Sequence, residues 1–192
     1  KYDKLCDEVN LYIQGIKGSL SGGTIASMEN LMKYIEQHPN KKNMYKSPFS
    51  LNPIWKISDH VEQPRPKSIR WDKRVKKWTC PFLMAEINTR IVRRTNSIAD
   101  FSYGENFKYI EMSSYNRGLY GFLKALMMLT ILGLLQSSIK KKALFQILKK
   151  MALPKPGEGP SKDKMKNGFF KMKLIGYFNN VTKISVTVEG EN

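Results

Sequence analysis

Two stretches of the sequence carry residue types that could bind an anion or a cofactor. The first is the corner Ser21, Gly22, Gly23 and Thr24, which precedes a run of apolar residues at helical spacing. Backbone amides at a helix start have no partner within the helix, and the positive end of the helix dipole favours an anion. These four residues are therefore candidates for binding an anion or another electron-rich ligand. The alternative is that Thr24 only caps a helix at a tight bend.

The corner lacks the spacing of the known nucleotide-binding loops. A phosphate-binding loop needs a lysine after its second glycine, and a dinucleotide fingerprint needs G-x-G-x-x-G directly after a strand. The stretch SLSGGTIAS contains no such lysine, and the glycines at positions 15, 18, 22 and 23 do not have the fingerprint spacing. The sequence therefore indicates a helix start that could face an anion, and not a complete nucleotide site.

The second stretch, INTRIVRR, gathers polar and basic side chains in a segment with helical spacing. Its candidates are Asn88, Arg90, Arg93 and Arg94. The three arginines are three and four residues apart, so a helix would place them on one side, where guanidinium groups match carboxylate or phosphate. We therefore expect this side of the helix to bind an anion. The alternative is a solvated or salt-bridged face, with Glu86 or Glu111 as partners.

The remaining sequence offers little other chemistry. The two histidines, His38 and His60, and the two cysteines, Cys6 and Cys80, have no metal-ligand spacing. We therefore expect no metal, and no side chain can be nominated as catalytic. Two widely separated cysteines favour a reducing compartment over a disulfide framework.

The hydrophobic pattern predicts an α+β fold with a mixed, mostly antiparallel sheet covered by helices on one face. The helix after the first strand should end near His38, because Pro39 cannot continue it. Asn179 and Asn180 are expected to form a tight turn. Strands are predicted at 9–16, 107–112, 169–178 and 181–188, short extended segments at 68–71 and 76–79, and helices at 25–35, 81–97, 118–135 and 139–151.

Length and composition are those of one globular domain, covering 1–192. Hydrophobic residues make up 41% and the net charge is +17. We expect a flexible proline- and lysine-rich connection at about 39–67 and an apolar-basic helical pair at about 118–151. A net charge of this size is compatible with a nucleic-acid partner, with an anionic membrane surface or with an ordinary lysine-rich solvated surface.

No nucleic-acid-binding module is visible in the sequence, so we expect no specific nucleic-acid partner. No secretory leader is visible either, so we expect an intracellular location.

Four ordered motifs resemble the second domain of saccharopine dehydrogenase-like oxidoreductases. The motifs are Ser21–Thr24 with Ala26–Ser27, Trp78-x-x-Pro81–Phe82-x-Met84–Ala85, Ile87–Thr95, and Tyr103–Gly104-x-x-Phe107-x-Tyr109-x-Glu111. That family includes trans-acting enoyl reductases and a eukaryotic branch on membranes and lipid droplets. The resemblance implies an excised substrate and dimerisation domain, a homodimer, and a missing N-terminal Rossmann domain that would hold most of an NAD or NADP cofactor. It also implies that the Ser21 corner faces the interdomain cleft together with Asn88 and Arg90, and that Arg93 and Arg94 bind an anion or brace the site. Trp78, Pro81 and Phe82 would shape an apolar wall, with core packing as the alternative for Phe82.

The apolar stretch and the lysines after it allow two interpretations. The stretch from 125 to 135 is short for a bilayer span, which favours a buried core or dimer-interface helix. The alternative is a helix on an anionic membrane or lipid-droplet surface. Its candidate contacts are Leu126, Leu129, Leu132, Lys140, Lys141 and Lys142.

Taken together, the sequence predicts the substrate-side domain of an NAD(P)-dependent oxidoreductase with a hydrophobic or lipid-like substrate. This chain alone is expected to be inactive, because the cofactor residues lie elsewhere. The alternative is a non-catalytic dimerisation or membrane-surface module. Because the resemblance includes a branch on membranes and lipid droplets, we expect an intracellular, membrane-associated protein.

Overall fold

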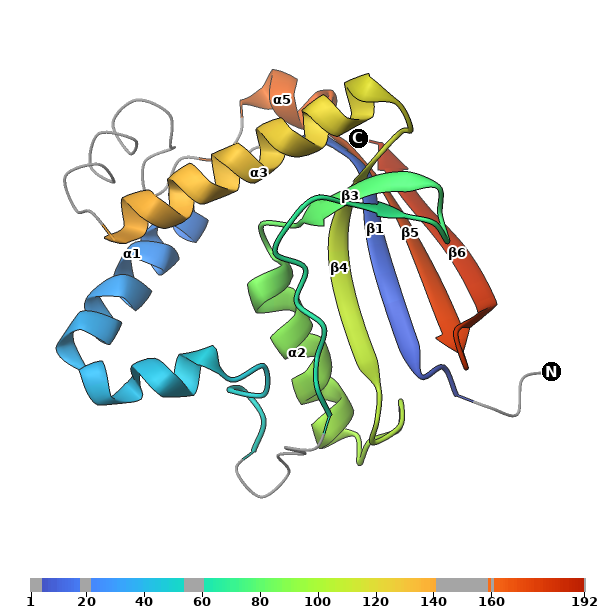
Figure 1. Cartoon of the computed structure of the whole chain (residues 1–192). Helices are drawn as coiled ribbons and strands as arrows, with labels where there is room; N and C mark the ends of the chain where they lie inside the picture. Colours follow the sequence, from blue (N-terminus) through green and yellow to red (C-terminus); the bar gives the residue numbers. More distant parts are fainter. Residues whose placement is uncertain (1–4, 18–21, 54–60, 141–158, 160, 192) are drawn as a thin grey trace.

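A computed structural model describes residues 5–17, 22–53, 61–140, 159 and 161–191 (Figure 1). Six strands form one sheet in the order β2-β3-β4-β1-β5-β6. The strands are β1 (Glu8–Lys17), β2 (Arg70–Asp72), β3 (Lys77–Pro81), β4 (Lys108–Tyr115), β5 (Phe169–Phe178) and β6 (Val181–Glu191). The helices are α1 (Gly22–Gln37), the 3-10 helix η1 (Pro39–Lys46), α2 (Ala85–Ile98), α3 (Leu119–Lys140) and the short α5 (Lys162–Lys166).

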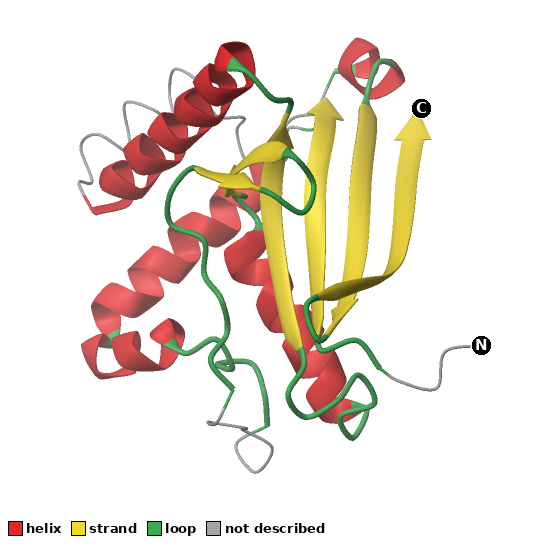
Figure 2. Ribbon diagram, turned by 45° about the vertical axis from the view of Figure 1, so that its right-hand side comes forward, coloured by secondary structure: helices red, strands yellow, loops and turns green. Residues whose placement is uncertain are grey.

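The sheet is mixed and mostly antiparallel, which confirms the predicted α+β class. Strand β1 lies in its middle, parallel to β4 and antiparallel to β5. The remaining pairs, β2 with β3, β3 with β4, and β5 with β6, are antiparallel. In Figure 2 the long helices lie mainly on one side of the strands.

Strand β1 divides the core between the two faces of the sheet, because successive side chains point to opposite faces. Leu11 and Ile13 pack with Tyr109, and Val92 of α2 lies against this cluster. Tyr12 packs on the other face in a second cluster. The other members of that second cluster are Ile110, Met112, Ile175 and Tyr177. Its outer cover includes Val75, from the turn between β2 and β3.

Two local predictions are confirmed. Helix α1 ends at Gln37, just before the residue preceding Pro39. Asn179 and Asn180 have φ values of 49° and 62° and join β5 to β6. Asparagine tolerates this left-handed conformation, and two such residues suit a tight hairpin turn.

Several element boundaries differ from the prediction for physical reasons. The helix expected from 81 begins at Ala85, because Pro81 still pairs with Met112 as part of β3. The connection expected to be irregular over 39–67 begins with η1, and its residues 47–53 and 61–65 are tied to α2 by side-chain hydrogen bonds. Helix α3 continues to Lys140, and the helix expected at 139–151 otherwise lies outside the described residues.

Candidate functional site

Helix α2 packs against β4, and the connection reaches both of them. Gln63 donates to the carbonyl of Phe107 and accepts from the backbone amide of Tyr109, and buried polar side chains join these three segments. Arg93, Gln63 and Glu111 are only 5%, 7% and 3% exposed. Polar groups this deeply buried are stable only when they are hydrogen bonded. These side chains therefore form a network whose members depend on one another.

Arg93 is the centre of this network and holds three segments together. Its Nε donates to Oε1 of Gln63 at 3.1 Å, and one terminal nitrogen donates to the carbonyl of Pro48 at 3.3 Å and to Oγ1 of Thr89 at 3.1 Å. The other terminal nitrogen donates to the carbonyl of Tyr109 at 3.2 Å. Burial lowers the pKa of Arg93 to about 10, so it keeps its charge at neutral pH. A fork of fixed donors suits this bracing role better than a lysine would.

Glu111 supplies a buried carboxylate on the strand beneath α2. Its two oxygens accept hydrogen bonds from Nδ2 of Asn88 and from the hydroxyl of Tyr109, both at 3.0 Å. Burial raises the pKa of Glu111, while these two hydrogen bonds and the positive charge of Arg93 oppose the shift. The pKa of Tyr109 is raised chiefly by burial, and next by the charge of Glu111 and by the hydrogen bond to it. Asn88, a cleft candidate, is thus used to orient Glu111.

The other two arginines of α2 also face protein groups. Arg90 donates to the carbonyl of Ser47 at 3.3 Å and forms an ion pair with Glu86 at 2.7 Å, one helical turn away. Arg94 donates to the carbonyl of Leu51. The ion pair between Arg90 and Glu86 is the salt-bridged face that the sequence allowed as an alternative, and the bond of Arg94 is a bracing contact.

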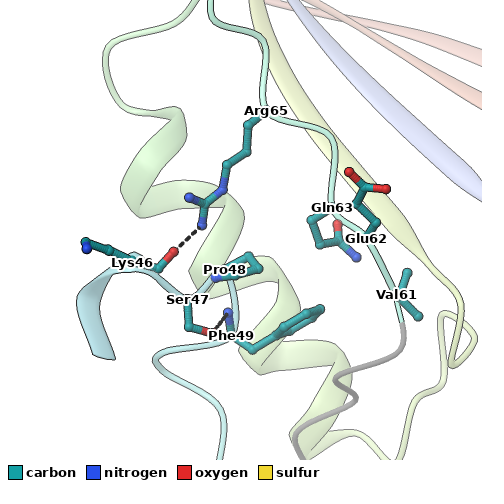
Figure 3. Close-up of a pocket in the computed structure, with 8 residues that line it drawn as sticks. All are labelled: Lys46, Ser47, Pro48, Phe49, Val61, Glu62, Gln63 and Arg65. Carbon is teal, nitrogen blue, oxygen red and sulfur yellow. Dashed lines mark hydrogen bonds between the residues drawn. The ribbon is translucent and has the colours of Figure 1, made fainter. Parts of the chain in front are cut away.

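A pocket lies where the two described parts of the connection approach each other (Figure 3). Its volume is about 490 Å³. The lining residues are Lys46, Ser47, Pro48, Phe49, Val61, Glu62, Gln63 and Arg65. Arg65 donates to the carbonyl of Lys46 at 2.8 Å across its mouth. Gln63 lines this pocket and also bonds Arg93, so it connects the pocket with the buried network.

The corner at the start of α1 is described only in part. Gly22 is buried and Gly23 is exposed, whereas Ser21 and the side chain of Thr24 lie outside the described part of the chain. Asn88 and Arg90 make the bonds to β4 and to Ser47 given above. That the corner and these two residues share one cleft stays a prediction.

The aromatic wall expected from the sequence is divided by the fold. Phe82 packs against the Leu11 core cluster, as the core-packing alternative predicted. Pro81 is paired within β3, and Trp78 lines a groove on the opposite flank of that strand with Trp71 and Phe122. The fold therefore does not bring these three side chains together into one substrate wall.

The apolar candidates of α3 do not share one face. Leu126 is 42% exposed and Leu129 is partly buried, whereas Leu132 is 7% exposed and belongs to the interior. The expectation that Leu132 meets a membrane is therefore wrong for this conformation. The side chain of Lys140 and all of Lys141 and Lys142 lie outside the described residues. No described helix has both the length and the apolar character needed to cross a bilayer.

Sequence reasoning missed Gln63 and the pairing of Glu111 with Tyr109. One signal was present, because Glu111 stands in a strand pattern where its neighbours Ile110 and Met112 are apolar. A carboxylate in such a strand must find partners if that face is covered.

Among the described residues, no group of histidine, cysteine, aspartate and glutamate could hold a metal ion.

Comparison with known proteins gives one consistent group of relatives. A Mycobacterium tuberculosis protein, provisionally named as a trans-acting enoyl reductase, is 30% identical over 175 residues, covering 86% of this chain and 41% of the relative. A trans-acting enoyl reductase of Mycobacterium bovis is 27% identical, and the match covers 87% of this chain and 42% of that relative. One of Mycobacterium ulcerans is also 27% identical, and the match covers 85% of this chain and 41% of that relative. The chain thus spans about two fifths of the length of the curated relatives it matches. No family model and no solved structure matches it. These relatives support a relationship to oxidoreductases.

Proposed function

We propose that this chain is the substrate-side domain of an NAD(P)-dependent oxidoreductase of the saccharopine dehydrogenase-like type, acting on a hydrophobic or lipid-like substrate. The observation that carries the proposal is the match over 86% of this chain to a relative named as an enoyl reductase. Enoyl reduction moves a hydride from NAD(P)H and a proton onto a carbon–carbon double bond, which leaves a saturated product and NAD(P)⁺. The natural polypeptide then needs a second domain to hold the cofactor.

This chain lacks the sequence fingerprint of a dinucleotide-binding fold, and its described strands do not have the strand order of one. A dinucleotide fold places G-x-G-x-x-G between a strand and a helix that returns to the adjacent parallel strand. Here β1 is followed by Gly22 and Gly23 without that spacing, and β2, β3 and α2 intervene before its parallel neighbour β4. We therefore assign no hydride-transfer step to residues of this chain. Its proposed roles are to bind and orient the substrate and to complete the interdomain cleft.

The candidate contributions of individual residues follow from the geometry. The first turn of α1, with Gly22 and Gly23, offers backbone close to a ligand. Asn88 is partly exposed and donates to Glu111, so its proposed role is to stand at the edge of the site and to fix the orientation of that buried carboxylate. Arg93 keeps α2, the connection and β4 in register. A loss of Arg93 would therefore displace the site without touching the substrate.

The test is NAD(P)H oxidation by the natural polypeptide that contains this chain. We expect a preceding domain with a dinucleotide fingerprint, enoyl-substrate-dependent loss of absorbance at the reduced-nicotinamide band, and no turnover by the 192-residue chain alone. Asn88→Ala should lower kcat/KM, while an exposed change such as Lys33→Gln should not. A natural polypeptide without such a domain, or cofactor oxidation that is independent of any enoyl or lipid-like substrate, would rule the proposal out.

One observation favours a second candidate, a membrane-surface module. Helix α3 exposes an apolar stripe, and a strongly basic chain is attracted to anionic lipid. The stripe comprises Leu119, Tyr120, Leu123, Leu126, Met127, Ile131 and Leu134. Flotation with phosphatidylserine-containing vesicles should carry the protein upward, and Leu123→Gln with Met127→Gln should abolish this. Equal flotation of the variant, or none by the parent protein, would remove this candidate.

A further inference from the structure

The ribbon formed by β2 and β3 sorts its side chains between two sides. Asp72 and Val75 point to the sheet, where Oδ2 of Asp72 accepts a hydrogen bond from Tyr12 and Val75 covers the second core cluster. Trp71 and Trp78 are directly opposite each other in the ribbon and lie on its other side. Alternation along the strands thus directs the two indoles away from the sheet.

The two indoles form one wall of a groove between the ribbon and the start of α3. Its volume is about 1080 Å³. The lining residues are Trp71, Lys73, Lys76, Trp78, Arg117, Gly118, Leu119 and Phe122. Trp78 contacts Trp71 and Phe122 edge to face, with ring centroids 5.3 Å and 5.1 Å apart. Trp71 is 36% exposed, so its ring is accessible to a ligand.

The charge of the groove is positive and uncompensated. Lys73, Lys76 and Arg117 line it and no lining residue is acidic. Within the described ranges, none of these three side chains forms an ion pair. The only carboxylate of the ribbon turn, Asp72, is turned toward the sheet and is occupied by Tyr12 and by the backbone amide of Arg74.

We propose that this groove binds a nucleoside phosphate, with the base against the Trp71–Trp78 pair and the phosphate at Lys73, Lys76 and Arg117. Stacking on aromatic side chains accepts any base, and guanidinium and ammonium groups provide the phosphate contacts. The volume is slightly above the usual range of small-molecule sites, and the groove is open to solvent. Only three cations line the groove, which suits one nucleotide better than an extended strand.

This binding site does not depend on the proposed oxidoreductase function. Its residues lie apart from the Arg93 network, in the ribbon and at the first turn of α3. The ligand could be a free nucleotide or the nucleotide end of a larger cofactor, because both present the same base and phosphate. Titration with AMP, and separately with NADPH and coenzyme A, distinguishes these sources.

The test is calorimetric titration combined with tryptophan fluorescence, since two of the three tryptophans line the groove. AMP should quench fluorescence saturably, whereas adenosine and inorganic phosphate, which each offer half of the ligand, should bind much more weakly. Added salt should weaken AMP binding, because screening reduces the attraction of exposed charges. Trp71→Leu should weaken binding about tenfold, the range found for loss of one stacking partner.

Two triple variants that remove the same amount of charge distinguish binding in the groove from non-specific attraction of AMP to a basic protein. Lys73→Gln with Lys76→Gln and Arg117→Gln should abolish AMP binding and leave the circular dichroism spectrum unchanged, because all three side chains are exposed. The control changes three exposed lysines elsewhere, Lys17→Gln with Lys33→Gln and Lys67→Gln, and should bind as the parent protein does. Equal binding by both variants would overturn the proposal. Phosphate binding as tight as AMP binding, or affinity only for long single-stranded oligonucleotides, would overturn it as well.

Discussion

The hydroxyl of Tyr12 lies 2.8 Å from Oδ2 of Asp72, a residue 60 positions further along the chain. This bond joins the central strand of the sheet to the last residue of β2. Tyr12 is 1% exposed and also lies 3.5 Å from the hydroxyl of Tyr177. The ribbon therefore covers the second core cluster through a buried polar contact as well as through Val75.

Tyr12→Phe should destabilise the protein by about 1–3 kcal/mol, because it leaves a buried carboxylate oxygen without its donor. Urea unfolding followed by circular dichroism measures this as a lower midpoint at an unchanged slope. Tyr103→Phe is the matched control, since Tyr103 is 39% exposed. Equal effects of the two changes would show that the Tyr12–Asp72 bond contributes nothing.

Arg93→Leu should destabilise the protein by about 3–5 kcal/mol, because it breaks a buried charged network and leaves the carbonyls of Pro48 and Tyr109 without donors. The connection should become more accessible as well, so limited proteolysis should cut near Pro48 faster. Arg94→Leu removes an exposed arginine and should have a much smaller effect. Unchanged cleavage in the Arg93 variant would mean that the connection is held by other contacts.

Two glycines of α3 should respond to alanine in opposite directions. A Cβ at Gly121 would lie 1.7 Å from the carbonyl oxygen of Asn116, so Gly121→Ala must distort the start of the helix. At Gly133 no atom of the described residues lies within 4 Å of that position, and the better helix propensity of alanine should add up to about 1 kcal/mol. Thermal unfolding of both variants should show a lower Tm for the first and a higher Tm for the second. A lower Tm for both would contradict the open space at Gly133.

Cys80 should resist thiol reagents in the folded protein. It is fully buried, and burial raises the pKa of its thiol to about 11, so almost no thiolate forms near neutral pH. Cys6 is partly exposed and should be modified first. Iodoacetamide labelling at pH 8, followed by peptide mass spectrometry, should show label on Cys6 alone, and label on both after addition of guanidinium chloride. Rapid labelling of Cys80 without denaturant would show that β3 opens readily.

Local patterns were sufficient for the elements that depend on neighbouring residues. Period-two alternation predicted β1, β5 and β6, the proline at 39 predicted the end of α1, and the Asn179–Asn180 pair predicted the hairpin turn. Backbone sterics and short-range hydrogen bonding operate within a few residues, so one sequence window contains the information. The spacing of the three arginines of α2 was local in the same sense.

Only the tertiary structure decided what Arg93 contacts and where the aromatic residues gather. Arg93 meets Pro48 and Gln63, 45 and 30 positions away, because the connection folds back over α2. Trp78 and Phe82 lie four residues apart in the sequence, yet one lines the basic groove and the other packs in the core, because β3 ends between them. Such contacts depend on strand order and on which face of the sheet each element covers. They arise from pairings between distant segments, which no local pattern of the sequence specifies.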